Sequence, residues 1–177
     1  AAGTALAHTE FGVEGMANRR LFEHLVPAEA REPADRMNPL MRHLGEWWNN
    51  AAQLEGLFGA GMTLDELRRA SQWLQCSGLA IALEADRRRL PRTSMVLPWQ
   101  LAESYPNAWG TALVGFDGEP KPALGVLARA FRDERATIVT ERTTWGEHAT
   151  ISAAAWLWSR TGRPSGGRLE LAVDVIP

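Results

Sequence analysis

The stretch AHTEFGVEG, residues 7–15, sets the expectations for the fold of this chain. A short apolar run leads into Glu10, and two glycines, Gly12 and Gly15, follow within five residues. An apolar run of this length bounded by glycine is typical of a short buried strand, which we place at residues 4–11. The glycines leave room for another group to approach the Glu10 carboxylate closely.

A second strand-like run, SMVLPWQ, occupies residues 94–100 and ends in an aromatic side chain and an amide. Between the two runs, Thr63-Leu64-Asp65-Glu66 has the form of a capping box, which predicts a helix from there to about Arg88. Pro91 ends that helix. Strand, helix and strand in this order are typical of parallel strands joined by a crossover helix. The expected buried side of the helix consists of Leu67, Ala70, Ser71, Leu74, Gly78 and Ile81.

The segment before that helix, residues 14–62, is expected to be a long irregular connection, rich in Pro, Asn and Gly. Short helices are expected near residues 19–25 and 40–49. A connection of this length inside a compact domain is usually functional, for example as the wall of a site. A further helix is expected over residues 123–131, with Pro122 near its first position.

The character of the chain changes after Arg132. Segments 137–143, 150–159 and 168–175 are rich in strand-forming residues, and the last of them alternates apolar and polar positions. Consecutive strands after an α/β segment indicate two domains, with a boundary near Asp133. Three strands do not close a sandwich and two β/α units do not close a barrel, so we interpret the chain as one piece of a longer polypeptide.

Composition argues against several classes of protein. The net charge is −2, with 19 basic and 21 acidic residues interspersed, so we expect neither nucleic acid nor an anionic membrane surface as a partner. No apolar run approaches the roughly 20 residues that span a bilayer. The first residues lack the basic start of a signal peptide, which leaves a cytoplasmic or a secreted location open. The single Cys76 excludes an internal disulfide.

No metal and no cofactor are expected from the sequence. The four histidines, His8, His24, His43 and His148, show no metal-ligand spacing. Eight tryptophans against one tyrosine are unusual, and indole faces stack well on sugars. We expect most of these tryptophans to lie in the core.

Four stretches, taken in order, resemble one family. They are TEFG at residues 9–12; GEWWNN at 45–50 with LFG at 57–59; ASQWLQ at 70–75 with EADRRR at 84–89; and PWQLAESYPNAW at 98–109 with PKPA at 120–123. Their order and spacing are similar to the end of the catalytic barrel in glycoside hydrolase family 2, the family of β-galactosidases, β-glucuronidases and β-mannosidases. The resemblance covers roughly residues 7–131.

The resemblance implies an α/β fold. Residues 1–133 would be the C-terminal part of a (β/α)8 TIM barrel, with strands 7 and 8 and their helices. Residues 134–177 would begin an immunoglobulin-like β-sandwich. It also implies retaining hydrolysis of a β-glycoside, with Glu10 as the nucleophile and the acid/base on an upstream strand outside this chain. The 177-residue chain alone would then be inactive. Its partners would be the carbohydrate and the rest of the same polypeptide.

β-Mannosides are favoured as substrates because Glu-Phe-Gly followed by a Gly-containing loop looks mannosidase-like. The alternatives are a β-galactosidase or β-glucuronidase specificity, a non-catalytic carbohydrate-binding module, and an interaction module built from the β-domain. Ala102 stands where many relatives carry an asparagine that contacts the sugar, so some of the family's hydrogen bonds to the sugar are expected to be absent here.

The resemblance also implies roles for individual side chains. Trp99, at the end of the second strand, would form the apolar floor beneath the sugar. Gln100 and Glu103 would contact its hydroxyl groups. In the long loop, Trp48 is favoured over its neighbour Trp47 as a residue that lines the site. Glu14 is expected at the rim or in a structural position.

Overall fold

The computed structural model describes residues 6–34, 37–45, 50–141 and 149–162. The chain divides into two compact units, Ala1–Ala130 and Phe131–Pro177. Trp48 and the expected strand 168–175 lie outside the described residues. Among the helices that are described, none is long and apolar enough to cross a membrane.

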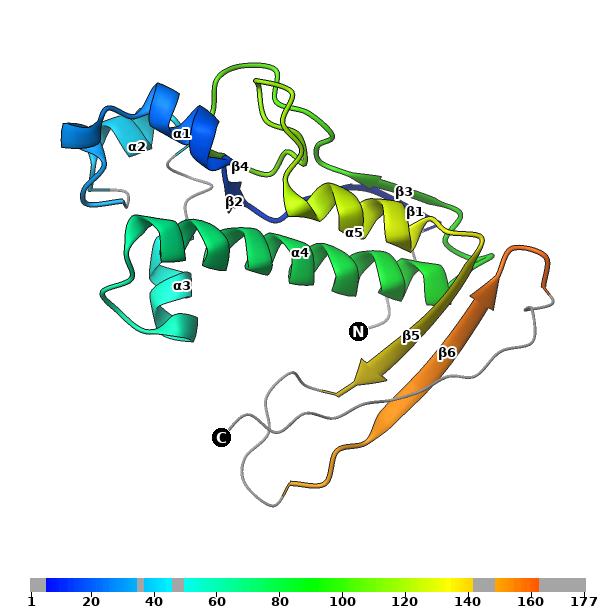
Figure 1. Ribbon diagram of the computed structural model, residues 1–177. Helices are drawn as coiled ribbons and strands as arrows, with labels where there is room; N and C mark the ends of the chain where they lie inside the picture. The colour runs from blue at the N-terminus through cyan, green and yellow to red at the C-terminus, as the bar shows by residue number, and fades with distance from the viewer. Residues whose placement is uncertain (1–5, 35–36, 46–49, 142–148, 163–177) are drawn as a thin grey trace. The chain divides into compact units, whose positions relative to one another are not determined.

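The first unit is mixed α/β (Figure 1). Its elements, in chain order, are β1 (Ala7–Phe11), β2 (Gly15–Met16), α1 (Arg19–Leu25), the 3-10 helix η1 (Ala28–Ala30), α2 (Pro39–His43), α3 (Ala51–Phe58), α4 (Leu64–Arg88), β3 (Met95–Pro98), β4 (Trp109–Gly110) and α5 (Pro122–Ala130). The short helix expected near residues 19–25 is present as α1, and the one expected near 40–49 as the shorter α2, which ends at His43. The helix expected over residues 123–131 is present as α5. Helix α3 was not expected.

Strands β1 and β3 pair in parallel, with Ala7 opposite Met95 and Phe11 opposite Pro98. The parallel pairing predicted from the strand, helix, strand order is confirmed. Helix α4 connects the two strands, and α5 runs along it (Figure 1). A core of Leu79, Leu83, Leu113, Ala123, Val126 and Ala130 joins the helices to the partly buried Phe11, Val13 and Val96. The two helices therefore cover one face of the strand pair.

A second core surrounds the antiparallel pair β2–β4, in which Met16 lies opposite Trp109. Both side chains are almost fully buried. Residues from α1, α2 and α3 pack around them, among them Leu21, Phe22, Met41 and Leu54. The long connection is thus mostly a small helical layer with its own core, because α3 contributes Leu54 where the sequence alone indicated an irregular chain.

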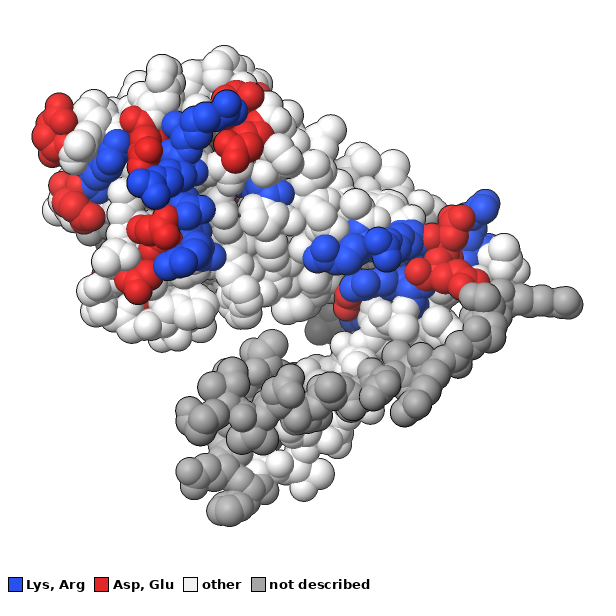
Figure 2. All heavy atoms as spheres, viewed as in Figure 1, with Lys and Arg blue, Asp and Glu red and all other residues white. Residues whose placement is uncertain are grey.

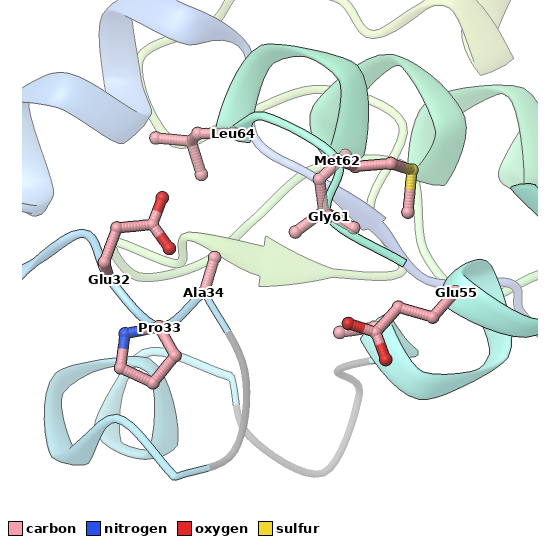
Figure 3. Close-up of a pocket in the computed structure, with 9 residues that line it drawn as sticks. Glu32, Pro33, Ala34, Glu55, Gly61, Met62 and Leu64 are labelled. Carbon is pink, nitrogen blue, oxygen red and sulfur yellow. The ribbon is translucent and has the colours of Figure 1, made fainter. Parts of the chain in front are cut away.

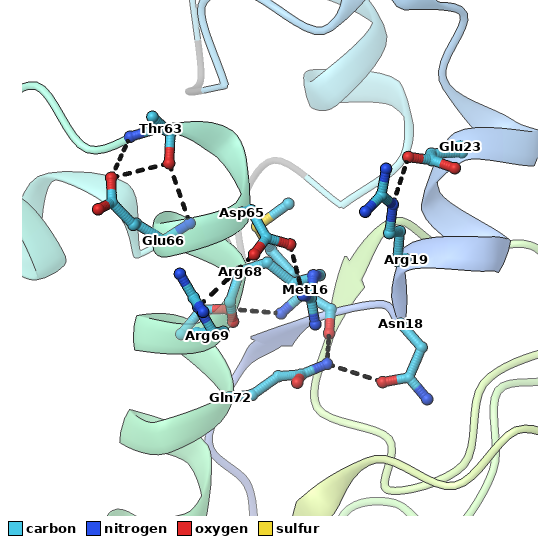
Figure 4. A network of polar contacts seen from close by, with 11 residues as sticks. Met16, Asn18, Arg19, Glu23, Thr63, Asp65, Glu66, Arg68, Arg69 and Gln72 are labelled. Carbon is cyan, nitrogen blue, oxygen red and sulfur yellow. Dashed lines mark hydrogen bonds and ion pairs between the residues drawn. The ribbon is translucent and has the colours of Figure 1, made fainter.

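Helix α4 begins as predicted. Thr63 Oγ1 accepts a hydrogen bond from the backbone N–H of Glu66, and the Glu66 carboxylate accepts one from Thr63 N at 2.8 Å (Figure 4). Its buried side differs from the expectation, because Ile81 is 58% exposed. The buried positions include four polar ones, Ser71, Gln72, Gln75 and Asp86.

Hydrogen bonds explain why polar side chains occupy that face. Gln72 Nε2 donates to the carbonyl of Met16 at 3.1 Å and to the Asn18 side chain at 2.9 Å (Figure 4). Gln75 Nε2 donates to the carbonyls of Val13 and Thr111, at 3.0 and 3.1 Å. These acceptors lie mostly in irregular backbone, which no ladder satisfies, so the helix turns amides toward them.

Strand β1 is also less buried than predicted. Thr9 and Glu10 are exposed, and the other three residues are partly buried. The expectation followed from a short apolar run, but in the first unit α4 and α5 cover only one face of the strand. The register of the β1–β3 pairing also shifts between His8 and Phe11, so the neighbours Thr9 and Glu10 lie at an irregularity of the strand, and both are exposed.

In the second unit, β5 (Glu134–Thr140) and β6 (Ala153–Ser159) form an antiparallel pair, in register from Glu134 opposite Ser159 to Thr140 opposite Ala153. Two of the three expected strands are therefore present near their predicted places. The part of the chain that the structure describes contains neither a closed barrel nor a sandwich, so the observed fold class is the coarser one, α/β followed by an antiparallel strand pair.

Candidate active site

A cavity of about 520 Å³ opens at the carboxyl ends of β1 and β3. It is lined by Glu10, Phe11, Gly12, Trp99, Gln100, Glu103, Ser104, Tyr105, Asn107 and Thr111. Glu10 belongs to β1, while Trp99 and Gln100 follow β3 directly. The Trp99 N–H donates to the Phe11 carbonyl at 2.7 Å, which extends the pairing of the two strands to the edge of the cavity.

The strand-end wall of this cavity consists of Glu10, Gly12 and Trp99. Glu10 is exposed, and Trp99 is 48% exposed, so both present side-chain surface to solvent at the cavity. Gly12 is required by close packing: a Cβ there would collide with the Trp99 carbonyl oxygen and lie 3.0 Å from the Thr111 side chain. The peptide bond between Trp99 and Gln100 is cis. The result is a carboxylate and an indole that share one hollow.

The loop wall consists of Glu103, Asn107 and Thr111, from the segment that connects β3 to α5. Asn107 is 4% exposed, and its Oδ1 accepts a hydrogen bond from Trp109 N at 3.0 Å. Burial raises the pKa of Glu103; the charge of Lys121 and hydrogen bonds from the Asn107 side chain and the Ala112 backbone oppose that shift. Glu103 is thus a half-buried carboxylate held from several sides.

Lys121 lies behind this wall. Its side chain is almost fully buried, and Nζ donates to the carbonyls of Gly15 and Gly110, at 3.0 Å each. Burial lowers the pKa of Lys121 to about 8, against the attraction of Glu103 and, more weakly, Cys76. One ammonium group therefore ties β2 to β4 beneath the cavity.

Four of the five predicted site residues meet in this cavity: Glu10, Trp99, Gln100 and Glu103. Their roles stay predictions, and Trp48 lies outside the described residues. Glu14 does not line the cavity; it is half-buried, and burial raises its pKa. His8 stacks on Phe11 with ring centroids 4.2 Å apart, and its Nδ1 lies 2.8 Å from the buried Asp86 carboxylate, which indicates a structural position.

Four residues that line the cavity were not predicted from the sequence: Ser104, Tyr105, Asn107 and Thr111. A usable signal was present, because these residues follow the end of β3, and the carboxyl ends of parallel strands meet at one edge of a sheet. Their detailed placement depends on Asn107 and Gly110 folding back on Glu103, which no periodicity encodes.

Other hollows and charges in the first unit offer less chemistry. A cavity of about 200 Å³ is lined by the segment after η1, by α3 and by the start of α4, with Glu32 and Glu55 on opposite sides of it (Figure 3). Within the described residues, no three His, Cys, Asp or Glu side chains are placed to hold a metal ion. Around α1 and the start of α4, basic and acidic groups alternate (Figure 2), and Arg20 pairs with Asp117 at 2.8 Å.

Comparisons with known proteins define the fold. No protein-family model and no curated protein matches the chain. Among solved structures, a β-D-mannosidase from Dictyoglomus thermophilum matches with a TM-score of 0.64 and 20% sequence identity. The match covers 74% of this chain and 16% of the β-mannosidase chain, so this chain spans about a sixth of that protein's length. At this identity the likeness shows a shared fold, and it supports in coarse form the fold that the sequence resemblance implies.

Proposed function

We propose that this chain carries the nucleophile-bearing part of the active site of a retaining β-glycosidase of the glycoside hydrolase family 2 type, with β-mannosides as its preferred substrates. The observation that carries the proposal is the shared cavity of Glu10 and Trp99, at the carboxyl ends of two adjacent parallel strands. In (β/α)8 barrels the active site is built at that edge. Residues 1–133 would be the end of the barrel and residues 134–177 the start of a sandwich.

In the proposed reaction, the Glu10 carboxylate attacks the anomeric carbon of the sugar. The bond to the leaving oxygen breaks, a separate carboxylic acid protonates that oxygen, and water then hydrolyses the glycosyl ester on Glu10. The second carboxyl group must lie about 5–5.5 Å from the first and must be protonated when it acts. Burial raises the pKa of Glu103, against the Lys121 charge and the Asn107 hydrogen bond, but the family resemblance implies that the acid lies on a strand upstream of this chain.

The acid is therefore assigned to residues outside this chain, and the 177-residue chain alone is expected to give no turnover. Trp99 would lie beneath the apolar face of the sugar, as exposed indoles do when they stack on C–H groups. Gln100 would contact hydroxyl groups from the same edge. Trp48 keeps the role that the sequence resemblance gives it.

Chemical rescue tests the assignment of Glu10 in the longer polypeptide that supplies the acid. Glu10→Ala should lose turnover of an aryl β-mannoside and recover part of it with added azide, because the small anion fits the space beside Gly12. The product should be the α-mannosyl azide. The β-azide would instead make Glu10 the acid/base. Glu14→Ala, a matched change at a carboxylate outside the cavity, should need no rescue.

Full turnover by Glu10→Ala without azide would overturn the proposal. Sugar binding by the unmodified polypeptide with no turnover of aryl β-mannosides, β-galactosides or β-glucuronides would assign it as a carbohydrate-binding module instead.

A further inference from the structure

Lys121 is the only lysine in the chain, and all other basic side chains that carry a permanent charge are arginines. It does not line the cavity, yet the cavity's loop wall converges on it. Its Nζ binds the carbonyl oxygen of Gly110, and two of its three N–H groups are used on Gly110 and Gly15. Burying an ammonium group this deeply is unfavourable unless a charge compensates it.

Gly110 is also the point where Glu103 and Asn107 meet. A Cβ on Gly110 would lie 2.6 Å from Asn107 Nδ2 and 2.7 Å from Glu103 Oε1. The absence of a side chain therefore lets these two groups approach each other and form the hydrogen bond between Asn107 and Glu103. The other carboxylate oxygen, Oε2, is buried and has no hydrogen-bond partner in the described part of the chain. Its charge requires compensation from nearby.

Asn107 transmits this arrangement to the cavity. Its Oδ1 accepts from Trp109 N while its Nδ2 donates toward Glu103, so both ends of the amide are fixed. Asn107 itself lines the cavity. The chain of contacts runs from a buried charge, through a carboxylate, to an amide that a ligand would meet.

We infer that Lys121 is a positioning residue of the candidate site: its ammonium group balances the charge of Glu103, and Glu103 in turn fixes the side-chain amide of Asn107 at the cavity wall. The inference deepens the proposed function and rests on it for the identity of the ligand, a β-mannoside. Lys121 touches no substrate in this arrangement. It acts through Glu103 and through the backbone of β2 and β4.

The charged groups around Lys121 come from two other elements. Glu103, in the loop after β3, and Cys76, on α4, both raise the pKa of Lys121, and burial lowers it to about 8. Arg129 of α5 acts on Cys76 in turn. Removal of the Glu103 charge should therefore lower the pKa of Lys121 further.

The single lysine allows a direct measurement. The 177-residue chain labelled with 13C at lysine Cε gives one lysine signal, and its titration reports Lys121 alone. A midpoint near pH 8 is expected in the unmodified chain, and a lower one in Glu103→Gln. Glu14→Gln, which neutralises another half-buried carboxylate, should leave the midpoint unchanged. A midpoint near the ordinary lysine value, or one that does not respond to Glu103→Gln, would overturn the inference.

A second measurement separates charge balance from simple backbone support. Methyl β-D-mannoside is titrated into the chain while the Asn107 side-chain amide signals are followed. Lys121→Met should weaken binding about tenfold, since an unbalanced Glu103 no longer holds the amide. The double variant Lys121→Met with Glu103→Gln should recover most of that loss, because a neutral glutamine needs no counter-charge and still accepts from Asn107.

Failure of this inference can be distinguished from failure of the proposed function. If both variants bind equally weakly, Lys121 only supports the carbonyls and the inference is wrong. Binding that Lys121→Met leaves unchanged would also exclude it. If the lysine titration behaves as expected but the sugar perturbs no signal even at high concentration, the charge network stands and the proposed function is wrong.

Discussion

The two walls of the cavity present carboxylates in opposite conditions. Glu10, on the strand-end wall, is exposed, and its carboxylate accepts no hydrogen bond from other described residues. Glu103, on the loop wall, is half-buried and held by Asn107, the Ala112 backbone and the charge of Lys121. A carboxylate that makes covalent bonds must have its oxygens available, whereas one that positions neighbours must have them engaged. Under the proposed function, this contrast favours chemistry at Glu10 on the first wall and an organising role for Glu103 on the second.

The largest expected effect tests this contrast at the level of turnover. In the longer polypeptide, Glu10→Gln should reduce kcat for an aryl β-mannoside by roughly four orders of magnitude, because the amide cannot form the glycosyl ester. Glu103→Gln should reduce it by about tenfold at most. The melting temperature should respond in the opposite order, since exposed Glu10 contributes little to stability.

Steady-state kinetics and thermal unfolding of the same two variants provide the measurement. If Glu103→Gln abolishes turnover while Glu10→Gln retains it, the roles of the two walls are reversed. Equal losses of turnover would remove the distinction between them.

The next largest effect concerns the support of the loop wall. Gln75 is fully buried on α4, and its Nε2 holds the carbonyls of Val13, Thr111 and Ala112. Gln75→Leu keeps the volume but leaves these acceptors unsatisfied, so it should lower the free energy of unfolding by roughly 3–4 kcal/mol. Urea unfolding measures it, and Gln53→Leu at an exposed position of α3 is the matched control. A loss below that of the control would show that the loop wall does not depend on α4.

The same glutamine shows which features the sequence could predict. The start of α4 was predictable because the Thr63 and Glu66 capping box is local, and the β1–β3 pair because its apolar runs flank a crossover helix. The polar buried positions of α4 were not predictable, because Gln75 is buried where it donates hydrogen bonds to carbonyls that are distant in sequence. Ile81 was misassigned for the same reason: apolar spacing carries no information on where unsatisfied backbone lies.

The candidate site divides in the same way. The predicted residues Glu10, Trp99 and Gln100 lie at strand ends, where sequence order fixes their place. Asn107 and Thr111 were missed because a loop that folds back places them at the cavity. That loop depends on the missing side chain of Gly110, and the need for glycine there is visible only from its contacts in the folded structure.

A smaller effect concerns pH and the loop wall's lysine. The pKa of Lys121 is about 8 in the folded chain against an ordinary 10.5, so the unfolded chain holds more protons between these values. The contribution of Lys121 to stability should therefore rise as pH increases from about 8 to 10.5, by up to about 3 kcal/mol. Burial raises the pKa of Cys76, so the folded chain holds more protons at that thiol than the unfolded chain. The contribution of Cys76 to stability therefore falls as pH increases. The measurement is the difference in urea unfolding between Cys76→Ala and the double variant Cys76→Ala with Lys121→Met across this range, because Cys76 and Lys121 affect each other's pKa. A difference independent of pH would mean that Lys121 keeps its ordinary pKa.

The smallest expected effect isolates the meeting point of the loop wall. Gly110→Ala places a methyl group against Asn107 Nδ2 and Glu103 Oε1, at 2.6 and 2.7 Å, so one of them must move. The expected loss in the free energy of unfolding is about 2 kcal/mol. Gly56→Ala, on α3 with open space around it, should instead stabilise the chain by about 0.5–1 kcal/mol.

The double variant shows which contact causes the loss. In an Asn107→Ala background the amide is gone, so the added cost of Gly110→Ala should fall by about half, and the two changes should couple as contacting residues do. Fully additive costs would mean that Gly110 is constrained by its backbone alone. In that case Glu103 and Asn107 do not depend on the missing side chain, and the loop wall is held together from the Lys121 side only.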